Sequence, residues 1–170
     1  MGAETQSMDL SIAGITVRLE GVRAALAPAL RRRYAAFKSG AATGAVWELD
    51  MAAPPEAAWP GDAPHVIVEH ASDGAVRYAM ADLDARWDPA AGRGRARLAA
   101  TEYAVDGLLR VWLSGELLRG PARGGLFHAA GAAREGRGWL FAGRSGAGKS
   151  TLAAACAPHE LLSDELTAVR

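Results

Sequence analysis

The spacing of hydrophobic positions predicts a strand and then a helix at the start of the chain. After a frayed start at residues 1–8, apolar side chains alternate loosely from Leu10 to Leu19, as they do in a half-buried strand. From Val22 to Phe37 they recur at helical spacing, and Gly40 is a usual stop for a helix. We therefore expect one strand, followed by one helix that ends near Gly40.

Short strands are expected between residues 45 and 99. The candidates are apolar or alternating runs separated by turn residues: Ala45–Met51, His65–His70, Val76–Ala81, Ala81–Trp87 and Ala96–Ala99. Asp73–Gly74 is a hairpin signal, and prolines between residues 54 and 64 indicate a loop. Trp47, Trp59 and Trp87 are expected to pack in a core, because no basic residues interleave with them as in a base-stacking surface.

A helix with a clear apolar face is expected from Thr101 to Arg119. Thr101 is suited to cap its N-terminus, and Glu102 stands in its first turn. The large side chains expected near one face are Tyr103, Leu108, Trp112, Leu113 and Leu117.

Two short apolar segments follow that helix, Gly125–Ala133 and Gly138–Ala142. The link between them, Arg134–Arg137, is too short for a parallel crossover, which needs about a dozen residues or more. We therefore expect an antiparallel hairpin. Together these elements predict an α/β fold, with an α+β region over residues 1–100 and a second domain over residues 101–170.

Residues 143–150 read Gly-Arg-Ser-Gly-Ala-Gly-Lys-Ser and match the G-x-x-x-x-G-K-[ST] phosphate-binding loop at every position. An apolar strand precedes this stretch, and a helix is expected from Ser150 to Cys156, as the motif requires. The glycines are expected to adopt positive φ and to bring backbone N–H groups against phosphate oxygens: Gly143, Gly146 and Gly148. The end of the helix would face the same anion.

Composition favours this interpretation over a glycine-rich turn that matches by accident. The chain contains 17 arginines but only two lysines, Lys38 and Lys149. One of the two lysines therefore stands where the loop needs a compact ammonium rather than a planar guanidinium.

Net charge and hydropathy narrow the class of partner. The formal net charge is zero, so the sequence has no excess of basic residues that would attract nucleic acid or anionic lipid. No apolar run approaches the 18 residues of a membrane span, and the N-terminus lacks the pattern of a secretory signal. Cys156 is the only cysteine, so an intramolecular disulfide is excluded. We expect a cytoplasmic protein that binds neither nucleic acid nor membrane, and homo-oligomerisation stays open.

A pair of acids follows the loop at short distance. Glu160–Leu162 reads as an apolar strand, and it leads through Ser163 to Asp164 and Glu165. The spacing predicts that these two carboxylates fall beside the loop. An acid at that place can hold Mg²⁺ or accept the proton of a hydroxyl nucleophile.

The combination of hairpin, loop and acids resembles the catalytic core of the HPr kinase/phosphorylase superfamily, specifically HPr-kinase-like proteins of bacterial peptide-modification clusters. In that family a histidine opens the first strand of the hairpin, the second strand enters a G-x-S-G-x-G-K-S loop, and a later strand ends in two aspartates. Here His128 precedes Gly143 by fifteen positions, as in the family, and Asp164 and Glu165 hold the aspartate positions. The more distant ATP-type phosphoenolpyruvate carboxykinases share this order. The resemblance covers about residues 125–166.

The resemblance implies roles for these residues. The nucleotide phosphates would be held by Gly143, Arg144, Ser145, Gly146, Ala147, Gly148, Lys149, Ser150 and Thr151. Lys149 would contact the β- and γ-phosphates, and Ser150 with Asp164 would bind Mg²⁺. Glu165 would accept the proton of an attacking serine hydroxyl, and His128 would tune that acid. Glu165 is one methylene longer than the family's aspartate, which moves the carboxylate by about 1 Å.

The implied activity is transfer of the γ-phosphate of ATP to a serine hydroxyl of a small protein or peptide. The family core continues past the acids, whereas this chain ends at Arg170, inside the strand expected after them. We therefore expect a truncated P-loop core, inactive in this form, with a split gene or a degenerate pseudokinase as alternatives.

Two other functions stay open. A nucleotide-binding regulatory module without transfer chemistry would fit the truncation and the glutamate at position 165. An ABC-type ATPase fragment would fit the run Ser-Gly-Ala-Gly-Lys-Ser-Thr-Leu, but 142 residues precede the loop here and the acids follow it too soon.

Overall fold

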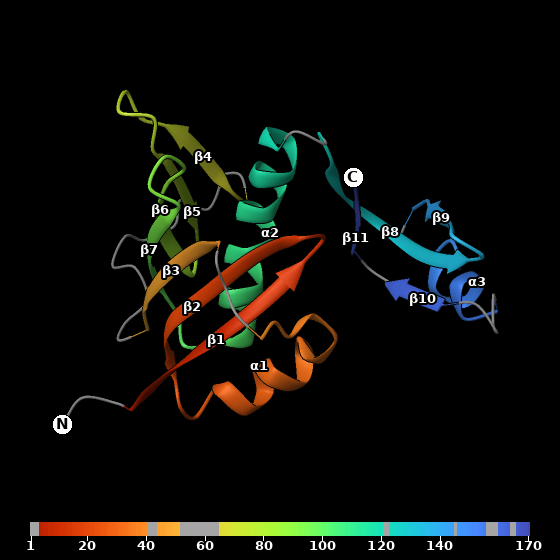
Figure 1. Cartoon of the computed structure of the whole chain (residues 1–170), viewed down its shortest axis with the longest axis horizontal. Helices are drawn as coiled ribbons and strands as arrows, with labels where there is room; N and C mark the ends of the chain where they lie inside the picture. The colour runs from red at the N-terminus through yellow and green to blue at the C-terminus, as the bar shows by residue number, and fades with distance from the viewer. Residues whose placement is uncertain are drawn as a thin grey trace. The chain divides into compact units, whose positions relative to one another are not determined.

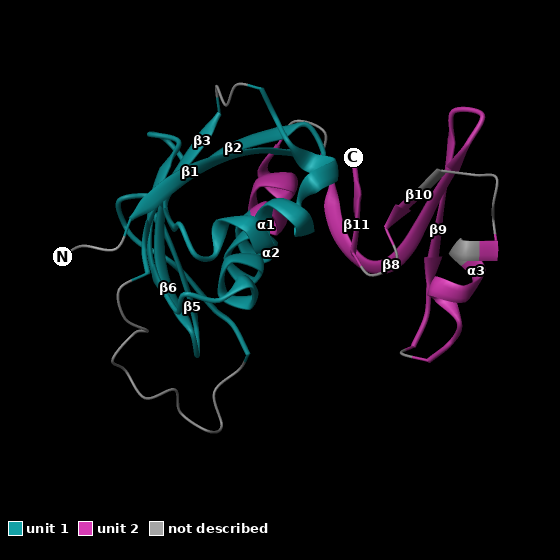
Figure 2. Ribbon diagram, turned by 90° about the horizontal axis from the view of Figure 1, so that it is seen from below, with its two compact units in different colours: residues 1–112 teal, residues 113–170 magenta. Residues whose placement is uncertain are grey.

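The computed structural model describes residues 4–40, 44–51, 65–120, 123–144, 146–155, 160–163 and 166–170 (Figure 1). The chain has a mixed α/β fold, rich in strands, with few helices among the described residues. It forms two compact units, unit 1 over residues 1–112 and unit 2 over residues 113–170 (Figure 2). The division falls inside the helix α2 (Glu102–Arg119), whereas the boundary predicted at residue 100 precedes that helix.

Unit 1 is built on a seven-stranded mixed sheet. Its strands are β1 (Thr5–Ile12), β2 (Ile15–Arg23), β3 (Ala45–Asp50), β4 (Ile67–His70), β5 (Val76–Met80), β6 (Leu83–Asp88) and β7 (Arg93–Leu98). They lie in the order β1-β2-β3-β7-β6-β5-β4. Strand β3 pairs in parallel with β2 and β7, and all other neighbours are antiparallel. The Asp73–Gly74 hairpin expected from the sequence is confirmed, whereas β7 begins at Arg93 rather than at the predicted Ala96.

The segment from Leu10 to Leu19, predicted as one strand, belongs to a hairpin of two strands. Strands β1 and β2 pair antiparallel around Ala13 and Gly14, whose φ angles are 50° and 72°. Two residues with positive φ form the tight turn whose twist suits a hairpin. Thr5 to Met8 belong to β1, so the expected frayed start does not extend over them. Gly14 is a turn signal inside the alternating run, and the strand prediction did not weigh it.

The first predicted helix is also too long. Val22 belongs to β2, and the helix α1 covers only Ala27–Arg33, followed by the 3₁₀ turn η1 (Ala35–Phe37). Pro28 stands in the first helical turn, where its missing N–H costs nothing and its fixed φ is already helical. Proline was therefore the start signal that the apolar spacing did not weigh.

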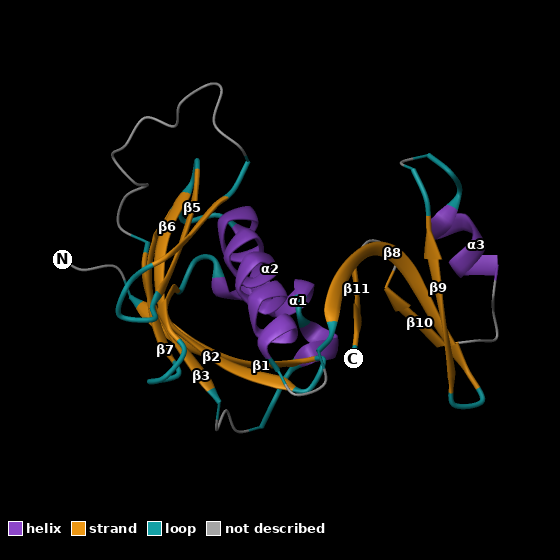
Figure 3. Ribbon diagram, turned by 90° about the horizontal axis from the view of Figure 1, so that it is seen from above, coloured by secondary structure: helices purple, strands orange, loops and turns teal. Residues whose placement is uncertain are grey.

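The core of unit 1 lies between the sheet and the helices α1 and α2 (Figure 3). Trp47, Trp87 and Trp112 are buried there, with ring centroids 5.2 to 6.3 Å apart. A Cβ at Gly94 would come within 2.5 Å of the Trp47 ring, so this glycine makes room for the indole. The predicted packing role of Trp47 and Trp87 is confirmed, while Trp59 lies outside the described residues.

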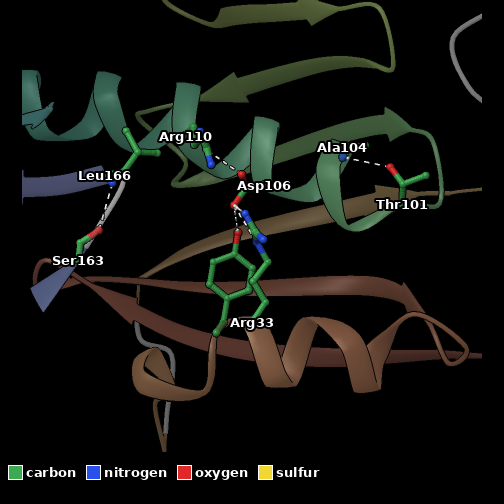
Figure 4. Close-up of polar contacts among 8 residues, drawn as sticks. Arg33, Thr101, Ala104, Asp106, Arg110, Ser163 and Leu166 are labelled. Carbon is green, nitrogen blue, oxygen red and sulfur yellow. Dashed lines mark hydrogen bonds and ion pairs between the residues drawn. The ribbon is translucent and has the colours of Figure 1, made fainter. Parts of the chain in front are cut away.

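Helix α2 begins as predicted, and it is tied to α1 by a polar cluster. The Ala104 N–H donates to Thr101 Oγ1 at 3.1 Å, which is the expected cap (Figure 4). Asp106 accepts from the Tyr34 hydroxyl at 2.8 Å and from Arg33 Nε at 3.2 Å. Leu108, Trp112, Leu113 and Leu117 are buried as predicted. Tyr103 is 79% exposed, so its assignment to the apolar face is wrong.

Unit 2 contains a second sheet centred on one long strand. Its elements are β8 (Gly125–Arg134), β9 (Arg137–Ala142), α3 (Lys149–Ala155), β10 (Glu160–Ser163) and β11 (Leu166–Val169). Strands β9, β10 and β11 each pair antiparallel with β8. Glu135 and Gly136 make the β8–β9 turn with φ of 52° and 74°. The antiparallel hairpin and the strand expected after the acids are confirmed.

Candidate functional site

The loop between β9 and α3 has the backbone of a tight glycine turn at two of its three glycines. The φ angles of Gly146 and Gly148 are 78° and 80°, in the left-handed region that favours glycine. Apart from their chain neighbours, no described atom lies within 4 Å of a Cβ built at either position, so the space beside these two glycines is open among the described residues. Positive φ was predicted for Gly143 as well, and this is wrong. A Cβ at Gly143 would lie 3.4 Å from the Ala147 Cβ, an ordinary contact.

The Lys149 ammonium lies over the backbone of this loop. Its Nζ donates to the carbonyl oxygens of Gly143 and Arg144, both at 3.0 Å. An ammonium carries three N–H donors, so two hold the side chain over the loop and a third can serve an anion. The Leu152 N–H donates to Gly148 O at 2.8 Å, so Gly148 is the N-cap residue of α3. The loop therefore presents a positioned positive charge beside exposed glycine backbone.

The other residues predicted to bind phosphate are exposed where the structure describes them. Ala147 and Arg144 are exposed, and the Ala147 N–H donates to Arg144 O at 3.1 Å, which closes a turn in the loop. Ser150 and Thr151 are exposed on the first turn of α3. Ser145 lies outside the described residues.

Strand β8 brings the ends of two other strands to the same level. Ala142, the last residue of β9, pairs with Ala129, and Ser163, the last residue of β10, pairs with Gly131. Because β9 and β10 both run antiparallel to β8, they point in the same direction on either side of it (Figure 3). With two interstrand spacings between them and a stagger of two residues along β8, their carboxyl ends are about 12 Å apart.

The two predicted acids cannot be placed directly. Asp164 and Glu165 lie outside the described residues, and so does Cys156. Their described neighbours on either side, Ser163 and Leu166, pair with Gly131 and His128 of β8.

His128 lies on β8 one residue before Ala129, and its side chain is exposed. The β8–β9 register pairs residues whose numbers differ by thirteen at Ala129 and Ala142. One step further along the hairpin, the same register brings His128 level with Gly143, the first residue of the loop. The fifteen-residue offset that carried the family resemblance is therefore the spacing that this hairpin requires. On its other side His128 pairs with Leu166, the residue after Glu165.

Three residues that the sequence interpretation missed hold the strands around β8 together. The buried Thr167 hydroxyl donates to Ala129 O at 2.9 Å. A Cβ at Gly131 would lie 2.8 Å from Thr167 Cγ2 and Oγ1, so only glycine fits there. Ser163 Oγ accepts from the Leu166 N–H at 3.1 Å (Figure 4). A serine three residues before a strand is a signal that could have revealed this last bond.

The described residues form neither a cluster of metal ligands nor a helix that could span a membrane. Across the described ranges, no three His, Cys, Asp or Glu side chains are grouped so that they could hold a metal ion. Of the predicted Mg²⁺ ligands, Ser150 is described and Asp164 is not. In the described part of the chain, no helix combines the length and the hydropathy that a membrane crossing needs.

Searches with the chain against protein-family models, curated proteins and solved structures found no match. What the site can do is therefore inferred from its own chemistry. It combines a loop with two left-handed glycines, an ammonium held over that loop, and two strand ends that reach the same level of β8.

Proposed function

We propose that the protein is a cytoplasmic ATP-dependent kinase of the HPr-kinase-like type, which transfers the γ-phosphate to a serine hydroxyl of a small protein or peptide. The observation that supports it most is the register of β8, which brings the ends of β9 and β10 to Ala129 and Gly131. The phosphate loop follows one of these ends and the two acids follow the other in sequence. Phosphoryl transfer needs these two groups side by side.

The loop has the properties that nucleotide phosphates require. Gly146 and Gly148 leave their backbone uncovered, and Lys149 keeps a donor for the β- and γ-phosphates. Phosphate oxygens accept several hydrogen bonds at once, and backbone N–H groups in a turn with left-handed residues provide a concave set of donors. In this proposal residues 143–151 hold ATP, with Ser150 and Asp164 as the residues for Mg²⁺.

The remaining roles concern the phosphate acceptor. Glu165 would take the proton of the attacking serine hydroxyl, while the loop and Lys149 would neutralise the charge on the phosphoryl group. His128 would influence that acid from the adjacent strand, since it pairs with the residue that follows Glu165. Mg²⁺, when bound, would neutralise charge shared by the β- and γ-phosphates.

Label transfer tests the proposed kinase activity. The protein, with any residues encoded beyond Arg170 included, is incubated with γ-labelled ATP, Mg²⁺ and bacterial cell extract, and labelled serine is measured after hydrolysis of the products. We expect transfer that Lys149→Ala abolishes and that Lys38→Ala retains, because Lys38 is the chain's other lysine and lies in unit 1. Equal transfer by both variants would contradict the proposal.

The glutamate at position 165 is the observation that favours a second function, nucleotide binding without transfer. Its carboxylate reaches about 1 Å further than an aspartate, and a displacement of that size can cost about a hundredfold in rate. MgATP binding that depends on Lys149, together with no label transfer by wild type or by Glu165→Asp, would select this second function. Transfer that appears only in Glu165→Asp would instead support the family's catalytic arrangement.

A further inference from the structure

Three arginines stand side by side on the sheet of unit 1, in neighbouring strands. The register pairs Arg77 of β5 with Arg86 of β6, and Arg86 with Arg95 of β7. Directly opposite residues in an antiparallel pair have Cβ atoms about 5 Å apart, and like charges there destabilise the sheet. We call these three residues the arginine row; each of them forms an ion pair with a nearby carboxylate.

The arginine row points away from the core. Each arginine occupies an exposed position in a strand whose alternate residues are buried. The side chains of Arg77, Arg86 and Arg95 are 45%, 55% and 84% exposed. All three line an open groove of about 510 Å³ on this face, together with the charged residues Glu48, Asp50, Asp84 and Arg97.

The intramolecular partners of the row are exchangeable. Arg77 pairs with Glu69 at 3.0 Å and with Asp84 at 2.9 Å, Arg95 with Glu48 at 2.9 Å, and Arg86 with Asp73. These carboxylates are themselves 40% to 61% exposed. Ion pairs so open to water contribute little to stability and are screened by salt. A ligand carboxylate can therefore replace them, and the guanidinium fork suits it in geometry.

The ends of the row limit the length of an anionic ligand. Glu69 pairs with Arg77 at one end, and Glu48 pairs with Arg95 at the other. Three strands span two interstrand spacings, about 10 Å, which accommodates two or three carboxylates. The flanking glutamates would repel a longer polyanion and attract cations. The pattern of charge is thus complementary to a short acidic stretch bordered by basic residues.

We infer that this face of unit 1 binds a short acidic segment of a partner polypeptide, with basic residues on either side of the acids. A polypeptide is favoured over a single-stranded nucleic acid, because no aromatic side chain for base stacking is among the described residues that line the groove. This surface is independent of the phosphate loop and does not rest on the proposed kinase activity.

Fluorescence anisotropy tests the inference with the full chain. The probe is a labelled peptide with three consecutive acidic residues between two lysines on each side. The comparison ligands are a peptide of the same composition with the acids dispersed, and a ten-nucleotide thymidine oligomer. We expect the first peptide to bind about tenfold more tightly than the other two at low salt, with the preference reduced at high salt.

Two double variants remove the same charge from different places. Arg86→Gln with Arg95→Gln should weaken peptide binding by about tenfold or more. Arg32→Gln with Arg137→Gln, both exposed and outside this face, should leave it unchanged. Because neutralising Arg86 relieves repulsion, the first variant should melt no lower than wild type, which separates lost binding from lost folding. Equal weakening by both variants, absence of peptide binding, or preference for the oligonucleotide would overturn the inference.

Discussion

At the scale of single residues, the candidate site depends on backbone conformation as much as on charge. Gly146 and Gly148 adopt φ values that cost other residues energy, and they leave open space where a side chain would stand. Lys149 is held by two carbonyl oxygens of the same loop, so its ammonium is fixed relative to those glycines. Gly143 belongs to the motif but does not share its conformational requirement.

This difference predicts unequal effects of alanine in the loop. Gly148→Ala places a Cβ on a left-handed backbone at a cost of about 1–2 kcal/mol, so the loop should rearrange and MgATP affinity should fall by about tenfold. Gly143→Ala adds a Cβ at ordinary contact distance and should bind MgATP like wild type. Calorimetric titration of the two variants checks this, and equal losses would show that motif membership matters rather than φ.

A second prediction at this scale concerns Tyr34 at alkaline pH. Burial, together with the Asp106 carboxylate that accepts its hydroxyl hydrogen, raises the pKa of Tyr34 well above its usual value. The unfolded chain ionises this tyrosine near pH 10. Its stabilising contribution is therefore fully present below pH 10 and is lost as pH rises above it.

Tyr34→Phe should remove that dependence. Its free energy of unfolding should be lower than wild type by about 1 kcal/mol at pH 8, for the lost hydrogen bond. The gap should narrow as pH rises above 10. Urea unfolding at pH 8, 10 and 11 measures both values, and a gap that widens with pH would contradict the pKa direction.

At the scale of elements, β8 organises unit 2. It pairs with β9 along one edge and with β10 and β11 in succession along the other. The strand that pairs with this edge of β8 changes from β10 to β11 between Gly131 and His128. In this stretch the Thr167 hydroxyl donates a hydrogen bond to the Ala129 carbonyl oxygen. Gly131 lacks the Cβ that would collide with Thr167. The strand ends beside the loop are thus fixed by one buried hydrogen bond and one glycine.

Thr167→Val should loosen this junction without changing its volume. The substitution leaves the Ala129 carbonyl without the hydroxyl donor, at a cost of about 1–3 kcal/mol. Amide hydrogen exchange in residues 125–134 should accelerate by about tenfold to a hundredfold. Thr151→Val is the matched control, because Thr151 is exposed on α3 and should leave that exchange unchanged. Unaltered exchange in Thr167→Val would show that β8 does not depend on this bond.

At the scale of the whole molecule, the sequence predicted elements better than pairings. The Asp73–Gly74 turn, the Thr101 cap and the β8–β9 link are local signals, and the structure contains all three elements. The β1–β2 hairpin was missed because Gly14 was not weighed as a turn signal, and α1 was drawn too long because Pro28 was not weighed. The parallel contacts of β3 with β2 and β7 join segments far apart in sequence, which local patterns do not specify.

In the candidate site too, local features were predicted from the sequence and long-range contacts were not. The loop motif and the offset of His128 were readable because both depend on residues within one hairpin and one turn. Thr167 was not recognised, since its role arises from a buried contact with a strand 38 residues earlier. The roles of Asp164 and Glu165 stay predictions, because these residues lie outside the described ranges.

The central claim is that residues 143–151 hold the phosphates of a nucleotide. Calorimetric titration of the chain with MgATP tests it most directly, with wild type, Lys149→Ala and Lys38→Ala compared under one condition. A charged hydrogen bond of about 2–3 kcal/mol predicts that Lys149→Ala weakens binding by about a hundredfold while Lys38→Ala binds like wild type. Binding of MgATP that is the same in all three proteins, or no binding by wild type, would contradict the claim.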